Sequence, residues 1–296
     1  MHPHTPQIRS LLAVVCSLAA ASAFAQQPDW SKVEIKATQV SGNVYMLEGQ
    51  GGNIGVCVGP DGILIVDDQF APLADKISAA LTSLNPGKLK YVVNTHHHGD
   101  HTGSNANMAG QGAVIIAQAN VRLNLAKDPK VAAAAMPVIT FTQGATVYFN
   151  GEEISATHYG PAHTNGDSVI RFKNANVIHM GDQMMTDRFP YIDMANGGDL
   201  DGIIANWKKI IADAPADVKI IPGHGRLATL DDLKAVLAIV EESAAFIREK
   251  MAKGATLEQL KAEGLPEKYQ SWGSGFINPH RWIETIYNQS HKTPKA

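Results

Sequence analysis

Four histidines and one aspartate fall within six residues of this 296-residue sequence, in the segment His96-His97-His98-Gly99-Asp100-His101. The segment follows the apolar run Tyr91-Val92-Val93, which predicts a buried strand that ends where the histidines begin. Imidazole nitrogens and carboxylate oxygens are the ligands that zinc and similar divalent ions prefer in proteins. The alternative is a surface histidine run or a hydrogen-bonded polar turn. A strand followed by so many ligand-type side chains favours a metal site over that alternative.

The spacing of these side chains suits an extended loop better than a helix. In extended backbone the side chains of residues i and i+2 point the same way, so His96 and His98 can converge on one ion while His97 points away. Asp100 and His101 come after the bend expected at Gly99 and are placed to face a second ion. The segment alone therefore offers ligands for more than one metal ion.

Three later segments repeat the order of apolar strand, glycine and ligand-type residue. Open α/β sheets place their sites beyond the carboxyl ends of the strands, so ligands in such segments can meet in one crevice. A Gly-Asp pair after a strand is common by itself, and the combination with the histidine segment is what indicates a shared metal centre. The segments are Gly160-Pro161-Ala162-His163 after the run 154–158, Gly181-Asp182 after 176–180, and Pro222-Gly223-His224-Gly225 after 219–221.

These motifs resemble those of the metallo-β-lactamase superfamily, and the resemblance extends over residues 40–227. It implies an α/β fold of the kind seen in that family, a four-layer αββα sandwich, and a dinuclear metal site that usually holds zinc. Carried over position by position, the resemblance implies seven ligands for two zinc ions per chain. His96, His98 and His163 would bind the first ion, Asp100, His101 and His224 would bind the second, and Asp182 would bridge the two.

Asp182 separates this sequence from part of the superfamily it resembles. The most familiar secreted β-lactamases hold a cysteine or serine at the matching position, whereas glyoxalase-II-like and lactonase-like members carry the aspartate. The resemblance therefore implies a hydrolase without pointing to a classical lactamase. Two metal ions roughly 3.5–4 Å apart can hold a water and lower its pKa towards about 7, which supplies hydroxide at neutral pH. Asp100 is the candidate catalytic residue, because it could orient that hydroxide or carry a proton in addition to binding metal.

Residues outside the ligand set are candidates for supporting roles. Asp67 ends an apolar strand, and it is expected either to hydrogen-bond a histidine of the H-x-H pair or to close a turn. Metal ligands need such partners because these fix the orientation of the ring. The irregular stretch 184–198 contains Arg188 and Tyr191, which are candidates to contact the substrate, since loops beside a site often carry specificity. Ordinary loop packing is the alternative for both.

The ligand segments require strands that end at a common edge. The sequence predicts two β-rich stretches, each followed by helices, which favours an αββα sandwich made of two similar halves. No linker rich in proline, glycine or serine interrupts the chain, so residues 26–296 are expected to form one metallo-hydrolase domain with C-terminal helices. The main helices are expected over 71–84, 103–109, 119–135 with a break at Asp128-Pro129, 200–212 capped by Asp199, and 229–253.

Residues 1–25 have the layout of a secretory signal peptide. Arg9 precedes the apolar run 11–20, and Ala23-Phe24-Ala25 offers a cleavage site of the small-x-small type. The apolar run is too short to serve as a membrane anchor. The mature chain is therefore expected to begin near Gln26, in the periplasm. It would hold one cysteine, Cys57, which excludes an intramolecular disulfide.

Composition narrows the class of partner. A net charge of −3 offers no basic field for nucleic acid, so the expected partner is a small-molecule substrate, while the oligomeric state is left open. The leading interpretation is an exported dinuclear zinc hydrolase that cleaves an ester, lactone, thioester or lactam. The alternatives are a metallo-β-lactamase proper, a single-iron oxygenase of the persulfide type, which the superfamily also contains, and a metal-binding relay protein without hydrolase activity.

Overall fold

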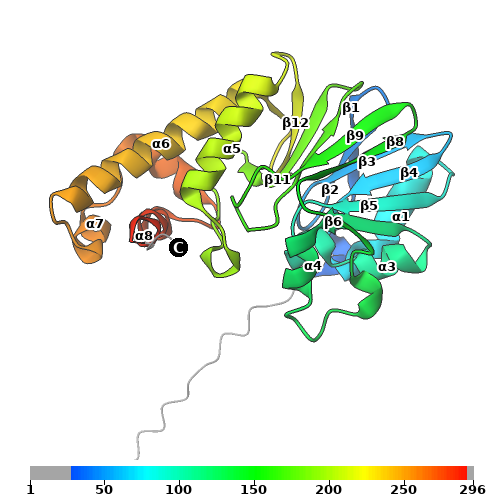
Figure 1. Cartoon of the computed structure of the whole chain (residues 1–296), viewed down its shortest axis with the longest axis horizontal. Coiled ribbons are helices and arrows are strands. Elements are labelled where there is room, and N and C mark those ends of the chain that lie inside the picture. Colours follow the sequence, from blue (N-terminus) through cyan, green and yellow to red (C-terminus); the bar gives the residue numbers. More distant parts are fainter. Residues whose placement is uncertain (1–27, 292–296) are drawn as a thin grey trace, which may run out of the picture.

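The computed structural model describes residues 28–291, so the expected signal peptide lies outside the described residues. The described chain forms two β-sheets packed face to face, with helices on both outer faces (Figure 1). This is the four-layer αββα sandwich that the sequence predicts. None of the described helices is long and apolar enough to cross a membrane.

The first sheet is built, within the described residues, from seven strands that lie side by side in chain order. The strands β1 to β4 pair antiparallel, whereas β4 to β7 pair parallel. Because β4 and β5 are parallel, Asp67 and the histidine segment emerge at the same edge of this sheet. The strands are β1 (Lys36–Ser41), β2 (Val44–Glu48), β3 (Ile54–Gly59), β4 (Gly62–Val66), β5 (Leu89–Asn94), β6 (Val114–Gln118) and β7 (Ile139–Phe141).

The second sheet has the strand order β13-β12-β11-β10-β9-β8. Only β11 and β12 pair parallel in it, so the ligand segments in these two strands also reach a common edge. The pairing of β11 with β12 is irregular between Gly181 and Met185, which bends this part of β11. The strands are β8 (Gly144–Phe149), β9 (Glu152–Thr157), β10 (Val169–Phe172), β11 (Val177–Met185), β12 (Lys219–His224) and β13 (Ala228–Thr229).

The helices divide between the two outer faces. The first sheet is covered by α1 (Ala74–Leu84) and α3 (Asn105–Gly110), whose apolar residues join its outer core. The second sheet is covered by α5 (Leu200–Asp213), α6 (Leu230–Ala252) and α8 (Pro279–Ser290). Shorter helices are α2 (Gly99–Thr102), α4 (Ala119–Leu125) and α7 (Leu257–Glu263), with 3-10 turns at Trp30–Lys32, Ala71–Leu73, Ala133–Ala135, Met194–Asn196 and Glu267–Ser274.

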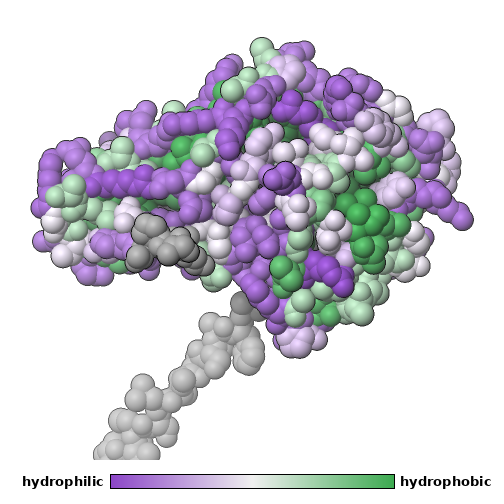
Figure 2. Space-filling model, in the orientation of Figure 1, coloured by the Kyte–Doolittle hydropathy of each residue, from purple (hydrophilic) through white to green (hydrophobic). Residues whose placement is uncertain are grey.

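Successive side chains along a strand point to opposite faces of the sheet and therefore enter two different hydrophobic cores. In β4, Leu64 and Val66 belong to the core between the two sheets, whereas Ile63 and Ile65 belong to the core under α1. On α6, buried residues recur at helical spacing, and hydrophilic residues lie along the side of this helix that faces solvent in Figure 2. The apolar periodicities therefore assign each element to its layer.

Most elements match the sequence prediction, and two helices differ. The helix expected over 119–135 ends at Leu125, because Pro129 disfavours helical backbone at the preceding residue, and only a 3-10 turn forms in the alanine run. The helix expected over 103–109 is preceded by a separate turn, α2, so Asp100 and His101 lie in helical rather than extended backbone. Asp199 does cap α5, since its side chain accepts a hydrogen bond from the Gly202 amide at 2.8 Å.

Candidate metal centre

The seven expected ligands come from four segments that end at the same edge of the sandwich. His96 and His98 follow β5, and Asp100 and His101 lie in α2 directly after them. His163 lies in the loop after β9, Asp182 lies within β11, and His224 is the last residue of β12. Asp182 thus belongs to a strand rather than to the turn after one, a difference caused by the irregular pairing of β11 with β12.

Three imidazoles gather around the first candidate ion. His98 Nδ1 lies 3.2 Å from His96 Nε2 and 2.9 Å from His163 Nε2. The carboxylate oxygen Oδ2 of Asp182 completes the group, at 3.6 Å from His163 Nε2 and 3.9 Å from His96 Nε2. These four ligand atoms all lie within 4.8 Å of one another, so the structure brings together the set expected for the first ion.

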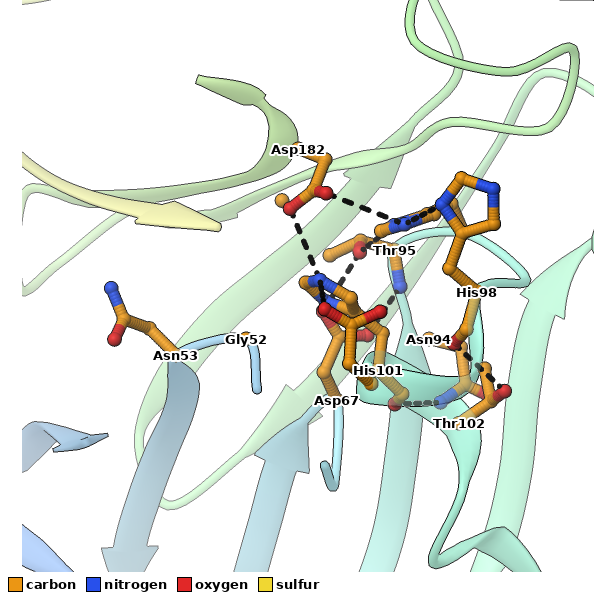
Figure 3. Close-up of polar contacts among 12 residues, drawn as sticks. Gly52, Asn53, Asp67, Asn94, Thr95, His98, His101, Thr102 and Asp182 are labelled. Atoms are coloured by element: carbon orange, nitrogen blue, oxygen red, sulfur yellow. Dashed lines mark hydrogen bonds and ion pairs between the residues drawn. The ribbon is translucent and has the colours of Figure 1, made fainter. Parts of the chain in front are cut away.

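A second group adjoins the first. His224 Nε2 lies 3.1 Å from Asp100 Oδ2, and His101 Nε2 lies 3.8 Å from the same oxygen. The other oxygen of Asp182, Oδ1, lies 3.0 Å from His101 Nε2 and 3.4 Å from His224 Nε2. Figure 3 shows Asp182 above His101, with a dashed contact between them. The two oxygens of one carboxylate therefore face two different ligand groups.

Each of four imidazoles is held by its outer nitrogen. His101 Nδ1 donates to Asp67 at 2.7 Å, His163 Nδ1 donates to the Tyr191 carbonyl at 2.7 Å, and His98 Nε2 donates to Asp193 at 2.9 Å. The Thr95 hydroxyl donates to Asp67 at 2.7 Å, which leaves its oxygen to accept from His96 Nδ1 at 3.0 Å. The inner nitrogen of every ring then carries a lone pair that points into the site.

This pattern of protons fits a metal cation. Three unprotonated nitrogens at 2.9–3.2 Å repel one another unless a positive ion lies between them. In the described part of the chain, the buried atoms His101 Nε2 and Asp182 Oδ1 also have no hydrogen-bond partner. Unsatisfied buried polar atoms are costly, and bonds to a divalent ion would satisfy both. The residues present therefore fit a metal site with nitrogen and oxygen ligands.

Burial and neighbouring charges set the protonation of the cluster. Burial lowers the pKa of His163 to about 4, which favours the neutral ring that a metal ligand must be. Burial opposes ionisation of Asp182, but the charges of His101 and His224 hold the pKa of this carboxyl well below its usual range. Neutral His96 and His163 thus face an ionised Asp182 carboxylate, as metal binding at the first group requires.

Asp67 has a different partner from the one expected. The sequence pointed to the H-x-H pair, whereas the Asp67 carboxylate contacts His101 directly and reaches His96 only through the Thr95 hydroxyl. It also accepts the Thr95 amide at 2.7 Å and lies fully buried with φ of +64°. One carboxylate therefore orients a histidine of each ligand group, at the cost of a left-handed backbone.

Asp193 joins the site without having been predicted from the sequence. Its carboxylate holds His98 across 95 positions of the chain, and it also accepts the Asn196 amide at the start of a 3-10 turn. An Asp-x-x-Asn turn signal is visible in the sequence, but nothing there connects it to His98. His97 lies outside both ligand groups described above, while His158 and His179 donate to backbone carbonyls of Asp167 and Asn53.

Close packing around the ligands requires residues without side chains. Gly181 has φ of +50°, and a Cβ there would lie 2.6 Å from the Thr95 side chain. A Cβ at Gly223 would collide with Asp182 Oδ1. The glycines in these ligand segments therefore leave room for the Asp182 carboxylate and for the Thr95 side chain.

A cavity of about 350 Å³ opens on the exposed side of both ligand groups. Arg188 and Tyr191, the two residues expected to contact substrate, both line it. Phe276 and Ile277 also line this cavity, and neither residue was predicted from the sequence to contact the substrate. The remaining lining residues are His98, Asp100, Asp182, Met185, Phe189 and His224.

Comparison with known proteins places this geometry in a family. The family model described as the metallo-beta-lactamase superfamily matches residues 37–224. A metallo-beta-lactamase from Pontibacter korlensis superposes with a TM-score of 0.62 at 16% identity and covers 70% of this chain and 99% of its own. The DIM-1 metallo-beta-lactamase gives 0.62 at 18% identity, covering 71% of this chain and 99% of its own. At such low identity these structures establish the fold.

A curated relative shares part of the sequence. The 2,4-dinitroanisole O-demethylase subunit alpha of Nocardioides sp. (strain JS1661) is 28% identical over 132 residues. The match covers 43% of this chain and 40% of that protein, so it spans well under two thirds of the relative.

Proposed function

The chain belongs to the metallo-beta-lactamase superfamily and is a metal-dependent hydrolase, and from this premise we propose that it binds two zinc ions and cleaves a small-molecule carbonyl substrate. The bond cleaved is that of an ester, lactone, thioester or lactam. We include in the proposal the ligand roles of the seven residues and a single metallo-hydrolase domain over residues 26–296. A small molecule rather than a nucleic acid is the partner that the net charge of −3 favours.

The observation that carries this proposal is the placement of Asp182. Its Oδ2 faces the three imidazoles of the first group, and its Oδ1 lies 3.0 Å from His101 and 3.4 Å from His224. A carboxylate so placed can neutralise charge on two cations at once. Nitrogen and carboxylate ligands in sets of this size are typical of zinc.

In the proposed hydrolysis, bound metal ions and the side chains of the protein would have different roles. Two bound zinc ions would supply a hydroxide at neutral pH and polarise the substrate carbonyl. The chain excludes water from one side, because His96, His101 and His163 are buried, and presents His98, Asp100 and His224 to the cavity. The Asp100 side chain is about a quarter exposed, and its Oδ2 lies beside His224 Nε2, where it can accept a proton from a reacting group in the cavity.

Export is a further part of the proposal. The support for it is the order of residues 1–25, with a positive start, an apolar run and Ala23-Phe24-Ala25. Mass spectrometry of the protein from its native host should find an N-terminus near Gln26. A full-length chain in the cytoplasm would contradict export and leave the metal centre unaffected.

Metal analysis and a substrate panel test the proposed activity. We expect two zinc ions per chain, loss of turnover on chelation, and recovery with zinc. The panel should hold aryl esters, lactones, thioesters, a cephalosporin and, because of the curated relative, 2,4-dinitroanisole. One iron per chain with oxygen consumption would favour the oxygenase alternative. Full metal content without turnover of any member would favour the metal-binding relay protein.

A further inference from the structure

The cavity over the metal ligands has two walls from distant parts of the chain. One wall comes from the segment 185–191, shortly after Asp182, and the other is formed by Phe276 and Ile277 of the C-terminal segment 272–282. The family match ends at residue 224, and the superposed lactamase structures cover 70–71% of the chain. The second wall therefore lies outside the part of the chain that the family model matches.

Three contacts fix the two walls to each other. The Phe189 amide donates to the Trp272 carbonyl at 2.9 Å. The Phe189 ring stacks on Trp282 of α8, with centroids 4.9 Å apart and planes inclined by 11°. Tyr191 meets Phe276 edge to face at 5.6 Å. Aromatic pairs of this geometry are stabilising, so the C-terminal segment is a built wall of the cavity.

Arg188 brings an unpaired cation into this cavity. Its Nε donates to the Thr186 carbonyl at 3.2 Å, and no carboxylate among residues 28–291 lies within ion-pair distance of the guanidinium. The stem of Arg188 packs on the C-terminal wall, where a Cβ at Gly275 would lie 3.1 Å from Arg188 Cδ. A half-buried guanidinium held this way keeps donors free for an anion in the cavity.

Phe276 adds an aromatic surface to the same cavity. Its side chain is 68% exposed, although large aromatic side chains usually gain free energy from burial. The guanidinium of Arg281 lies over its ring at 4.8 Å, and Tyr191 meets it from another side. These contacts hold Phe276 in a defined position at the cavity, and much of its apolar ring surface stays exposed to a ligand.

We propose that this cavity selects carbonyl substrates that carry both a carboxylate and an aromatic group, with Arg188 binding the carboxylate and Phe276 packing on the aromatic group. The inference rests on the proposed function, because it concerns the same site.

Two matched pairs of substrates test the proposal. The first pair is an aryl ester whose acyl chain ends in a carboxylate and the same ester ending in a carboxamide. The wild-type protein should prefer the carboxylate by roughly ten-fold or more in kcat/KM, as expected for hydrogen bonds to a charged group. Arg188→Gln should abolish that preference, mainly through KM. Gly275→Ala should weaken it in the same direction by displacing the arginine stem.

The second pair compares a phenyl-bearing with a methyl-bearing acyl group, both with the carboxylate. Phe276→Ala should lower kcat/KM for the phenyl compound roughly five-fold or more and change the methyl compound little, since stacking and apolar contact are lost only in the first case. Matched controls are Arg171→Gln on β10 and Tyr148→Ala, a tyrosine 77% exposed on β8. Neither residue lines this cavity, so both controls should keep the wild-type ratios.

The possible results distinguish a failure of the proposed substrate selectivity from a failure of the proposed hydrolase activity. Unchanged ratios in Arg188→Gln and Phe276→Ala, with normal metal content and turnover, would overturn the inference. If the wild-type protein turned over no ester, lactone, thioester or lactam, the proposed function would fail, and the cavity would then be tested by binding. Ketone analogues of the same pairs cannot be hydrolysed, and calorimetry should show the same carboxylate and phenyl preferences. Equal affinity for the carboxylate and carboxamide ketones would overturn the inference in that case.

Discussion

The carboxylate of Asp193 lies 2.9 Å from Nε2 of His98, on the opposite edge of the ring from the nitrogen that joins the ligand group. This contact holds a proton on Nε2 and leaves Nδ1 unprotonated towards the candidate metal, 3.2 Å from His96 Nε2. Hydrogen bonds to Asn196 and His98 lower the pKa of Asp193, so the carboxylate stays ionised and keeps accepting. A residue without direct access to the metal thus orients one of its ligands.

Replacement of Asp193 should weaken the first metal site. Asp193→Asn keeps the size of the side chain but loses the charge that fixes His98, so zinc affinity should fall about 10- to 100-fold. Competition with a chromophoric chelator measures this change. Asp217→Asn, at an exposed position where Asp217 bonds Asn176, is the matched control and should keep wild-type affinity. An unchanged affinity in Asp193→Asn would remove this residue from the account of the site.

Asp182 should control the occupancy of both metal positions. Its two oxygens face the two ligand groups, so Asp182→Ala should lower the zinc content of both and abolish turnover. Asp182→Cys should keep partial zinc binding, because thiolate is a good zinc ligand. Elemental analysis of the purified variants measures the occupancy. Full metal and full activity in Asp182→Ala would contradict the bridging role.

Cys57 should remain a protonated, unreactive thiol in the folded protein. It is fully buried between the sheets, and burial raises its pKa to about 11 from an ordinary value of 9.0. The thiol should therefore resist an aromatic disulfide reagent at pH 8 and react once denaturant unfolds the chain. Rapid labelling of native protein would contradict the burial.

The same shift predicts a pH dependence of stability. Between pH 9 and about 11 the unfolded chain loses the thiol proton while the folded chain keeps it. The free energy of unfolding should then fall as pH rises, by at most about 1.4 kcal/mol per pH unit from this group. Denaturant titrations at pH 8 and pH 10 measure the fall. Cys57→Ala should lack this part of the pH dependence, whatever its stability at pH 8.

The candidate ligands could be located from the sequence because each follows a local pattern. A strand followed by glycine and a histidine or aspartate identifies His163 and His224 without knowledge of the fold, and H-x-H spacing identifies His96 and His98. The partners of these ligands carry no such mark. Asp193 reaches His98 only because the chain folds back over 95 positions.

The C-terminal wall was unpredictable for the same physical reason. Phe276 lies between an irregular turn and α8, where neither hydrophobic period nor glycine spacing indicates what it will contact. Its place depends on the stacking of Phe189 against Trp282, a contact between separate segments. The substrate selectivity that we propose therefore depends on residues that only the assembled fold brings together.

The ranking of esters against β-lactams is the remaining prediction. Arg188 could pair with a lactam carboxylate, but it would serve a carboxylate-bearing ester equally, so charge alone does not favour the lactam. Leaving groups do differ: an aryl oxide departs as a stable anion, whereas a lactam nitrogen needs a proton or nearby positive charge. Asp182 places a carboxylate towards both ligand groups, which reduces the positive charge available to that nitrogen.

We therefore expect esters, lactones or thioesters to exceed β-lactams in kcat/KM, with lactam cleavage at most a side activity. The measurement compares a chromogenic cephalosporin with carboxylate-bearing aryl esters and lactones, with zinc supplied. A cephalosporin value ten-fold or more above every ester, which is about 1.4 kcal/mol of transition-state preference, would reverse the ranking and make the protein a lactamase.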